Sequence, residues 1–206
     1  MKIKRYTTGP IQVNTYLVYD ENNKKGFIVD PGGYSNNLTK DVFEQSIDIQ
    51  YIILTHGHGD HIGGVEEHLK DFPNAKVVAY REEQEMLENP NINCSIELFG
   101  KPITIIPDLY VDDNDTLSVG EMQLHFLFTP GHTKGGMSIY VDKYIFSGDT
   151  LFRFSIGRTD FYGGDFETLI KSIKERIFTF PDDTVVLPGH MGTTTVGEEK
   201  RGNPFV

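Results

Sequence analysis

The sequence is poor in cysteine and in positive charge. Cys94 is the only cysteine among 206 residues, and a single thiol cannot form an internal disulfide, which fits a reducing cytoplasm. Lysine and arginine number 19 against 30 aspartates and glutamates, so the formal net charge is −11. A protein of this charge is disfavoured as a partner of the phosphate backbone of nucleic acids. We therefore expect a cytoplasmic protein with no nucleic-acid partner.

Long apolar segments are also missing. The basic start of the chain is followed by residues 6–10, which are not the apolar core of a secretory signal. No apolar run is long enough to span a membrane. With 38% hydrophobic and 24% charged residues, the chain can bury one sizeable core. We expect one soluble domain over residues 1–206 with no membrane contact; the sequence gives no prediction of its oligomeric state.

One short stretch, from Thr55 to His61, gathers three histidines and an aspartate. The apolar run 51–54 precedes it and predicts a buried strand, so these side chains would lie in the loop at the carboxyl end of that strand. His56 and His58 alternate with glycine and can point to the same side of an extended backbone. Asp60 and His61 follow at once and cannot both face that way. The stretch therefore predicts two neighbouring metal positions.

Three later segments repeat the pattern of an apolar strand, small turn residues and a side chain that can bind metal. The strand 123–129 leads to His132, the strand 144–146 leads to Asp149, and the strand 184–187 leads to His190. A metal needs three or four ligands, and one loop alone does not supply two complete sets. Four strand ends that deliver such side chains indicate one shared metal centre.

The ligand motifs resemble, in their chain order, the signatures of the metallo-β-lactamase fold superfamily: HGHGDH at 56–61, PGHT at 130–133, GDT at 148–150 and PGH at 188–190. Three further segments, 14–16, 29–33 and 157–161, are similar to segments of its glyoxalase II branch. The likeness covers nearly the whole chain and is closest to the short, single-domain glyoxalase II-like hydrolases of bacteria. It implies an α/β fold, a four-layer αββα sandwich whose two halves meet at the metals.

The resemblance also assigns the metal ligands. It implies one metal held by His56, His58 and His132, a second held by Asp60, His61 and His190, and Asp149 as the bridge between them. A carboxylate has two oxygens and can bridge, whereas a neutral imidazole cannot. Zinc is favoured by this nitrogen-rich set, and iron or manganese would also be accepted by mixed imidazole and carboxylate ligands. We expect two divalent metal ions per chain.

This centre suits the hydrolysis of a thioester. A water shared by two cations loses a proton near neutral pH and can attack a carbonyl while a metal stabilises the oxyanion. A leaving thiolate, with a pKa of about 8.5, needs little help from a general acid. We assign catalytic roles to His58, Asp60 and Asp149. Two cations, two carboxylates and a hydroxide sum to about +1, so the site can attract an anion in an acidic protein.

We therefore expect a hydrolase for a small anionic thioester, S-2-hydroxyacylglutathione or a related bacillary or coenzyme thiol ester. The segment 151–164 is rich in arginine, phenylalanine and glycine, and long loops beside a site commonly hold substrate. Arg153, Arg158 and Tyr162 could meet a substrate carboxylate, although Arg158 and Asp160 could instead pair with each other. Full-length glyoxalase II carries a carboxyl-terminal helical domain that helps bind glutathione. This chain ends about sixteen residues after His190, so the thiol carrier is left open.

Asp30 ends an earlier strand in the manner of the ligand loops, but no histidine accompanies it. The resemblance makes it a supporting residue behind the ligands, and the alternative is a turn aspartate. Outside the motifs, alternation predicts strands at 11–19, 26–30, 76–80 and 137–141. Helical spacing predicts helices at 38–46, 62–72, 81–88 and 166–178, and the segment 90–107 is predicted to be loop with short extended pieces.

Other activities remain open. Persulfide dioxygenases share the histidine-rich motif and a segment similar to 157–161, but use one iron held by residues that match His56, His132 and Asp149. The segment 188–192 is more similar to the hydrolase branch. Lactone or β-lactam hydrolysis is a further variant, and a metal-binding protein without activity is the non-enzyme alternative. Two tightly bound metals would favour hydrolysis. One bound iron together with oxygen uptake would favour the dioxygenase, and an empty site would favour the inactive protein.

Overall fold

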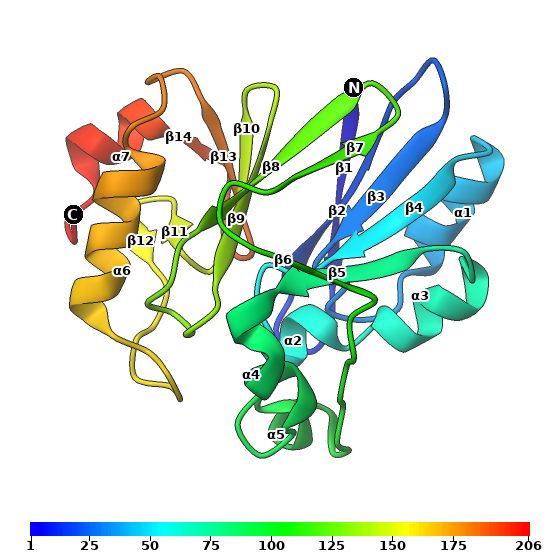
Figure 1. Cartoon of the computed structure of the whole chain (residues 1–206), viewed down its shortest axis with the longest axis horizontal. Helices are drawn as coiled ribbons and strands as arrows, with labels where there is room; N and C mark the ends of the chain where they lie inside the picture. The colour runs from blue at the N-terminus through cyan, green and yellow to red at the C-terminus, as the bar shows by residue number, and fades with distance from the viewer.

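Two six-stranded sheets face each other in the computed structural model, which describes residues 1–206 (Figure 1). The strands are β1 (Lys2–Thr8), β2 (Val13–Tyr19), β3 (Lys25–Val29), β4 (Asp48–Ile53), β5 (Lys76–Tyr80), β6 (Leu109–Val111), β7 (Thr116–Val119), β8 (Met122–Phe128), β9 (Met137–Val141), β10 (Tyr144–Gly148), β11 (Leu151–Phe152), β12 (Ser155–Ile156), β13 (Val185–Pro188) and β14 (Thr194–Thr195). The first sheet has the order β1-β2-β3-β4-β5-β6, and the second has the order β14-β13-β10-β9-β8-β7. Strands β11 and β12 form a separate small hairpin.

Helices cover the outer face of each sheet (Figure 1). They are α1 (Asn36–Glu44), α2 (Gly59–Ile62), α3 (Val65–Asp71), α4 (Gln84–Glu88), α5 (Ser95–Phe99), α6 (Phe166–Ser172), which a π turn at Ile173–Ile177 extends, and α7 (Val196–Gly202). Helices α1 and α3 lie on the first sheet, whereas α6 and α7 lie on the second. The predicted four-layer αββα sandwich is therefore what the chain forms. None of the helices has the length and apolar character that crossing a membrane needs.

Three apolar cores separate the four layers. The cluster between the sheets contains Phe27 and Phe126, the cluster under α1 and α3 contains Ile52, and the cluster under α6 and α7 contains Ile145. Successive residues of a strand point to opposite faces of the sheet. In β4, Ile52 accordingly faces the helices while Ile53 faces the other sheet, and both are fully buried. Burial on both faces explains why this strand reads as a continuous apolar run.

Strand direction brings the candidate ligand loops to one edge of the sandwich. In the first sheet β3, β4 and β5 run parallel, so their carboxyl ends lie side by side. In the second sheet β10 and β13 run parallel. Strand β8 has the same direction, because both β8 and β10 pair antiparallel with β9. The loops that follow β4, β8, β10 and β13 therefore meet at this edge, as the predicted ligand motifs require.

Two local predictions were wrong. The helix expected at 62–72 is divided into α2 and α3 at Gly63 and Gly64, because the backbone of Gly32 and Gly33 packs there. A Cβ on Gly63 would lie 2.6 Å from the carbonyl oxygen of Gly32, and one on Gly64 would lie 2.5 Å from the carbonyl carbon of Gly33. The segment 90–107, expected to be loop, contains the helix α5. Its five residues are too few to show a helical period.

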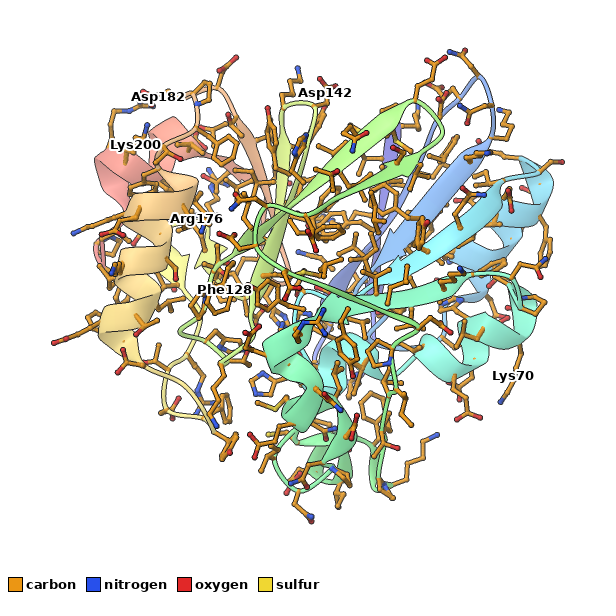
Figure 2. The ribbon with its side chains drawn as sticks, viewed as in Figure 1. Lys70, Phe128, Asp142, Arg176, Asp182 and Lys200 are labelled. Atoms are coloured by element: carbon orange, nitrogen blue, oxygen red, sulfur yellow. The ribbon has the colours of Figure 1, made fainter.

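Side chains cap the amino termini of three helices, α1, α6 and α7. Asp165 caps α6, since its side chain accepts a hydrogen bond from the amide of Thr168 at 2.8 Å. At the far end of the second sheet, Lys200 of α7 pairs with Asp182, 2.9 Å apart, in the loop that leads into β13 (Figure 2). This pair is exposed and adds little to stability.

Candidate metal centre

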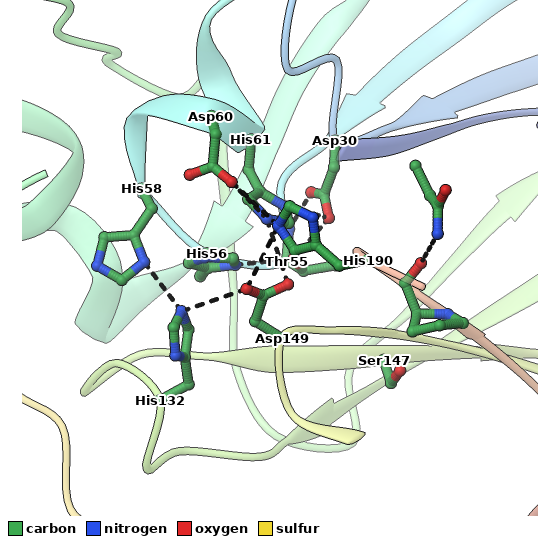
Figure 3. Close-up of polar contacts among 12 residues, drawn as sticks. Asp30, Thr55, His56, His58, Asp60, His61, His132, Ser147, Asp149 and His190 are labelled. Carbon is green, nitrogen blue, oxygen red and sulfur yellow. Dashed lines mark hydrogen bonds and ion pairs between the residues drawn. The ribbon is translucent and has the colours of Figure 1, made fainter. Parts of the chain in front are cut away.

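The seven predicted ligands converge between the carboxyl ends of the strands (Figure 3). One group of ligand atoms within 4.8 Å of one another belongs to His56, His58 and His132. A second group belongs to Asp60, His61 and His190, and a third, made of His56, His61 and Asp149, joins the two. The first sheet supplies the histidines of the 56–61 loop, and the second sheet supplies His132, Asp149 and His190. The centre therefore spans both halves of the sandwich.

Asp149 lies between the two groups. Its Oδ1 is 3.3 Å from His61 Nε2, and its Oδ2 is 3.7 Å from the Nε2 atoms of both His132 and His190. Asp60 approaches the second group only, with its Oδ2 3.1 Å from His190 Nε2 and 3.4 Å from His61 Nε2. One carboxylate thus faces histidines of both groups, which is the position that a bridging ligand occupies.

Hydrogen bonds behind the ligands orient three of the imidazole rings. His56 Nδ1 lies 3.1 Å from Thr55 Oγ1, and His132 Nδ1 lies 2.6 Å from the carbonyl oxygen of Arg158. His61 Nδ1 lies 3.0 Å from Asp30 Oδ2. Occupying Nδ1 in this way leaves Nε2 free to face the centre.

Asp30 is fixed in turn by two hydrogen bonds from Thr55. Its carboxylate also accepts hydrogen bonds from the amide of Thr55 at 2.8 Å and from the Thr55 hydroxyl at 2.7 Å. The side chain is buried and lies behind His61 on the side away from Asp149. Asp30 therefore connects the end of β3 to the start of the ligand loop.

Buried polar atoms without partners show that the residues fit a divalent cation. The Nε2 atoms of His56, His58 and His61 and the Oδ1 of Asp149 are buried and have no hydrogen-bond partner. In addition, His58 Nδ1 faces His132 Nε2 at only 2.9 Å. Buried polar groups that lack partners destabilise a fold, by about 1–3 kcal/mol each. Cations at the two positions would satisfy Nε2 of His56, Nε2 of His61 and Oδ1 of Asp149, and would lie between the facing nitrogens of His58 and His132. These are ligand types that zinc, iron or manganese accept.

Burial sets the charge of the first group of histidines. It lowers the pKa of His56 well below its ordinary value, the pKa of His58 to about 3, and the pKa of His132 as well. Neighbouring imidazoles add to the effect for His56 and His58. These three side chains are therefore neutral at pH 7, which is the form that binds metal.

His61 behaves in the opposite way. Burial opposes its charged form, but the carboxylates of Asp60, Asp149 and Asp30 outweigh burial and raise the pKa of His61 well above its ordinary value. For Asp149, burial favours the neutral acid, but His61 and the other histidines lower the pKa below its ordinary value. Without a metal, a proton on His61 partly neutralises the carboxylates of this group.

Glu83 joins two ligand loops, and sequence reasoning missed it. It is 1% exposed and follows β5 at the same edge of the first sheet. Its Oε1 accepts a hydrogen bond from the amide of Gly57 at 2.9 Å. Its Oε2 accepts from the Thr133 hydroxyl at 3.0 Å and from the amide of Gly135 at 2.8 Å. Burial raises the pKa of Glu83 to about 7, although these hydrogen bonds lower it. The only signal in the sequence is its place just after the predicted strand 76–80.

The loop that carries His190 is anchored by the start of β2. The Asn14 side-chain amide donates to the carbonyl oxygens of Pro188 and Met191 at 2.9 and 3.0 Å, and the Tyr16 hydroxyl donates to the carbonyl of Pro188 at 2.8 Å. The Asn14 backbone amide donates to Gly189 at 2.7 Å. These contacts across the two sheets explain why the segment 14–16 belongs to the motif.

A cavity of about 690 Å³ opens above the candidate ligands. Five of the ligands line it: His58, Asp60, His132, Asp149 and His190. Of the three predicted substrate-binding residues, only Arg158 lines the cavity. Its guanidinium makes two hydrogen bonds to Asp160, at 2.9 and 2.7 Å, and lies 4.1 Å from the centre of the Phe161 ring.

The structure does not bring the other two predicted residues to the cavity. The Tyr162 hydroxyl is held outside by Glu85 at 2.8 Å and by Lys134 at 3.1 Å. Arg153 lies against the exposed ring of Phe154, 5.7 Å from its centre. Both side chains take other partners, so only one of the three predicted substrate-binding residues of the segment 151–164 lines the cavity.

Two facing sheets with a histidine- and aspartate-rich centre at one edge define the class of protein. The chain belongs to the metallo-β-lactamase superfamily, whose family model matches residues 8–190. It is similar to the probable metallo-hydrolase YqgX of Bacillus subtilis strain 168, with 38% identity over 209 residues that cover 100% of this chain and 98% of that protein. It is also similar to the hydroxyacylglutathione hydrolase GloC of Haemophilus influenzae, with 34% identity over 211 residues that cover 100% of this chain and 98% of that protein.

Solved structures agree with this assignment. The B3 metallo-beta-lactamase BLEG-1 matches with a TM-score of 0.91 and 39% identity over 99% of both chains. TTHA1623 in a di-iron-bound form matches with a TM-score of 0.85 and 31% identity over 98% of this chain and 100% of that chain. ETHE1 from Myxococcus xanthus matches with a TM-score of 0.76 and 28% identity over 99% of this chain and 84% of that chain. The predicted family and fold are confirmed, and the chain is of a metallo-hydrolase type with a candidate metal-binding cluster.

Proposed function

We propose that this protein is a dinuclear metal-dependent hydrolase of small thioesters, S-2-hydroxyacylglutathione or a related thiol ester. The observation that carries the proposal is the set of buried, partnerless atoms of His56 (Nε2), His61 (Nε2) and Asp149 (Oδ1) in a group of seven ligand-type side chains, five of which line an open cavity. Similarity to proteins named metallo-hydrolase and hydroxyacylglutathione hydrolase supports it.

The seven candidate ligands would divide into two metal positions. His56, His58 and His132 would hold one cation, Asp60, His61 and His190 would hold the other, and Asp149 would bridge them. We favour zinc, and iron or manganese would also suit the ligand set. When bound, the two cations supply an ionised water as nucleophile and positive charge for the oxyanion of the attacked carbonyl.

The residues of the chain contribute position and charge. His58, Asp60 and Asp149 reach the cavity floor, so they lie next to the reacting carbonyl of a bound substrate. The pKa of Asp60 is lowered: burial opposes this, but His61 and the hydrogen bond with His190 outweigh it. Asp60 is therefore an anion at neutral pH and can orient a nucleophilic water by accepting its proton in a hydrogen bond.

A nucleophile from the protein itself is not needed. Cys94 lines the cavity, but burial raises the pKa of its thiol above the ordinary value. The thiol is therefore protonated at neutral pH and is a poor nucleophile. The proposed partner is a small anionic thioester, with Arg158 as the one cationic side chain at the cavity. We also propose a cytoplasmic location, in keeping with the single unpaired cysteine.

Steady-state hydrolysis of S-D-lactoylglutathione by the metal-loaded protein tests the proposal. We expect turnover that disappears in His58→Ala, because this change removes a ligand that also lines the cavity floor. His125→Ala is the matched control, since His125 is exposed on β8 and lies outside the ligand groups. Absence of hydrolysis with glutathione, coenzyme A and small acyl thioesters would contradict the proposal.

A persulfide dioxygenase is the second candidate function. The grouping of His56 and Asp149 near His132 favours it, since these positions match the iron ligands of persulfide dioxygenases. Oxygen uptake with glutathione persulfide by iron-loaded protein that contains one metal per chain would establish it. We place the hydrolase first because the second group, Asp60, His61 and His190, is complete.

A further inference from the structure

One side of the cavity above the candidate ligands is apolar. Six hydrophobic side chains form this apolar wall: Ile11, Leu98, Phe152, Ile156, Phe161 and Met191. They come from four separate places, namely the loop before β2, the helix α5, the β11–β12 region with the loop that follows it, and the loop after His190. The wall is therefore assembled by the fold and is not a local run of apolar sequence.

Part of the apolar wall is exposed although the protein has large buried cores. Ile11 is 49% exposed and Met191 is 56% exposed. The backbone of Met191 has a φ of 66°, a left-handed conformation that side chains other than glycine rarely adopt. The side-chain amide of Asn14 donates a hydrogen bond to the carbonyl oxygen of Met191 and holds this residue in place. Exposed apolar side chains beside a functional centre are the usual sign of a surface that a ligand covers.

Charged groups are scarce on the same surface. Apart from the candidate ligands, only Glu97 and Arg158 among the cavity residues carry a charge at neutral pH. Arg158 already binds Asp160 through two hydrogen bonds. Lys134 is engaged by Glu85 and Tyr162 and does not line the cavity. A carrier with several charged groups, such as a tripeptide thiol, would meet only one cationic side chain, Arg158, which would have to exchange Asp160 for the carrier. The carboxylate of Glu97 would repel its anionic groups.

We infer that the cavity selects thioesters that carry an apolar arm next to the thioester group, on a carrier with at most one ionised group. This inference rests on the proposed thioester hydrolysis and specifies its substrate. The thioester carbonyl would face the candidate ligands, the apolar arm would cover Leu98, Met191 and their neighbours, and an anionic group would reach Arg158 at the rim. A volume of about 690 Å³ accommodates a whole small thioester of this kind.

Binding of uncleavable thioethers tests the apolar wall separately from the chemistry. The probes are S-ethyl, S-butyl and S-hexyl N-acetylcysteamine, titrated calorimetrically into the metal-loaded protein. Each buried methylene should raise affinity about fourfold, so butyl to hexyl should gain about fifteenfold. The heat capacity change of binding should become more negative along the series. An affinity that does not change with chain length would overturn the inference.

A matched pair of variants on α5 locates the effect. Leu98→Ala shortens a wall residue and should reduce the gain per methylene. Ile96→Ala removes a side chain that is 40% exposed on the same helix but does not line the cavity, and the gain should persist. Equal gains in the two variants would show that the chain binds elsewhere and would overturn the assignment.

Hydrolysis of the corresponding acyl series separates this inference from the proposed function. Acetyl, butanoyl and hexanoyl N-acetylcysteamine thioesters should show kcat/KM rising with length, and hexanoyl should exceed S-D-lactoylglutathione. If S-D-lactoylglutathione is hydrolysed but kcat/KM does not change with acyl length, the inference would be overturned while the proposed hydrolase function would stand. If thioether binding strengthens with chain length but no thioester is hydrolysed, the apolar binding site would be supported and the proposed thioester hydrolysis would be refuted.

Discussion

Removing the Glu83 carboxylate should weaken one metal position more than the other. Glu83 accepts hydrogen bonds from Gly57, which separates His56 from His58, and from Thr133, which follows His132. It therefore fixes the two loops that supply all three ligands of the first position. No contact of Glu83 reaches the group of Asp60, His61 and His190.

The magnitude follows from the number of donors. Glu83→Ala leaves the buried amides of Gly57 and Gly135 and the Thr133 hydroxyl without their acceptor. A buried donor left without its acceptor costs about 1–3 kcal/mol. Loss of a partner behind the ligands typically costs about 10–100-fold in metal affinity. We expect a loss in this range at the first position and a smaller loss at the second. Glu83→Gln keeps one acceptor oxygen and should lie between Ala and the parent protein.

Competition with a metal-sensitive chelator measures both affinities, and imidazole nitrogen NMR shows which histidines release metal first. Glu82→Gln is the control, because Glu82 is the exposed neighbour of Glu83. Unfolding in urea with the metal removed reports the effect on fold stability separately. Equal weakening of both positions in Glu83→Ala, or no weakening, would refute the claim that this carboxylate positions one set of ligands.

Three further outcomes are expected. Asp30→Asn should weaken the second position about 10–100-fold, because the amide no longer fixes His61 as a carboxylate does; the same chelator assay measures this, and selective loss at the first position would contradict it. Since the pKa of His61 is raised, a metal must displace its proton, so affinity at the second position should fall as pH decreases through that pKa, by up to about tenfold per pH unit. The first position, whose histidines have lowered pKa values, should show no such dependence near neutrality, as chelator titrations between about pH 6 and pH 8 can determine. Phe126→Ala should lower the free energy of unfolding by about 3–5 kcal/mol in urea denaturation, because it opens a cavity between the sheets; a change below about 1 kcal/mol would show that the core collapses around it.

The candidate ligands could be found from the sequence because each one lies in a segment that follows an apolar strand. His56 follows β4, Asp149 follows β10 and His190 follows β13 within a few residues. Parallel strands place such ends together, so local sequence and strand direction are enough to predict that these side chains meet. The alternation of Ile52 and Ile53 between two cores likewise explains a strand that the apolar run alone predicted.

What the sequence did not indicate depends on contacts between distant segments. The role of Glu83 appears only when the end of β5 lies against loops from both sheets. The break between α2 and α3 is imposed by the backbone of Gly32, about thirty residues earlier in the chain. Tyr162 looked available to a substrate because nothing nearby in sequence revealed Glu85 as its partner. Position in the chain predicts where a loop lies, but not which partner its side chains choose.

The location of the candidate ligands on both sheets has a consequence for the life of the protein in a cell. A cation bound there would act as a reversible cross-link that closes the stretch of chain from His56 to His190. Free metal at about a thousand times the dissociation constant stabilises the folded state by about 4 kcal/mol. Protein made under metal starvation would therefore open more often and be degraded faster, so metal supply would control its abundance as well as its activity.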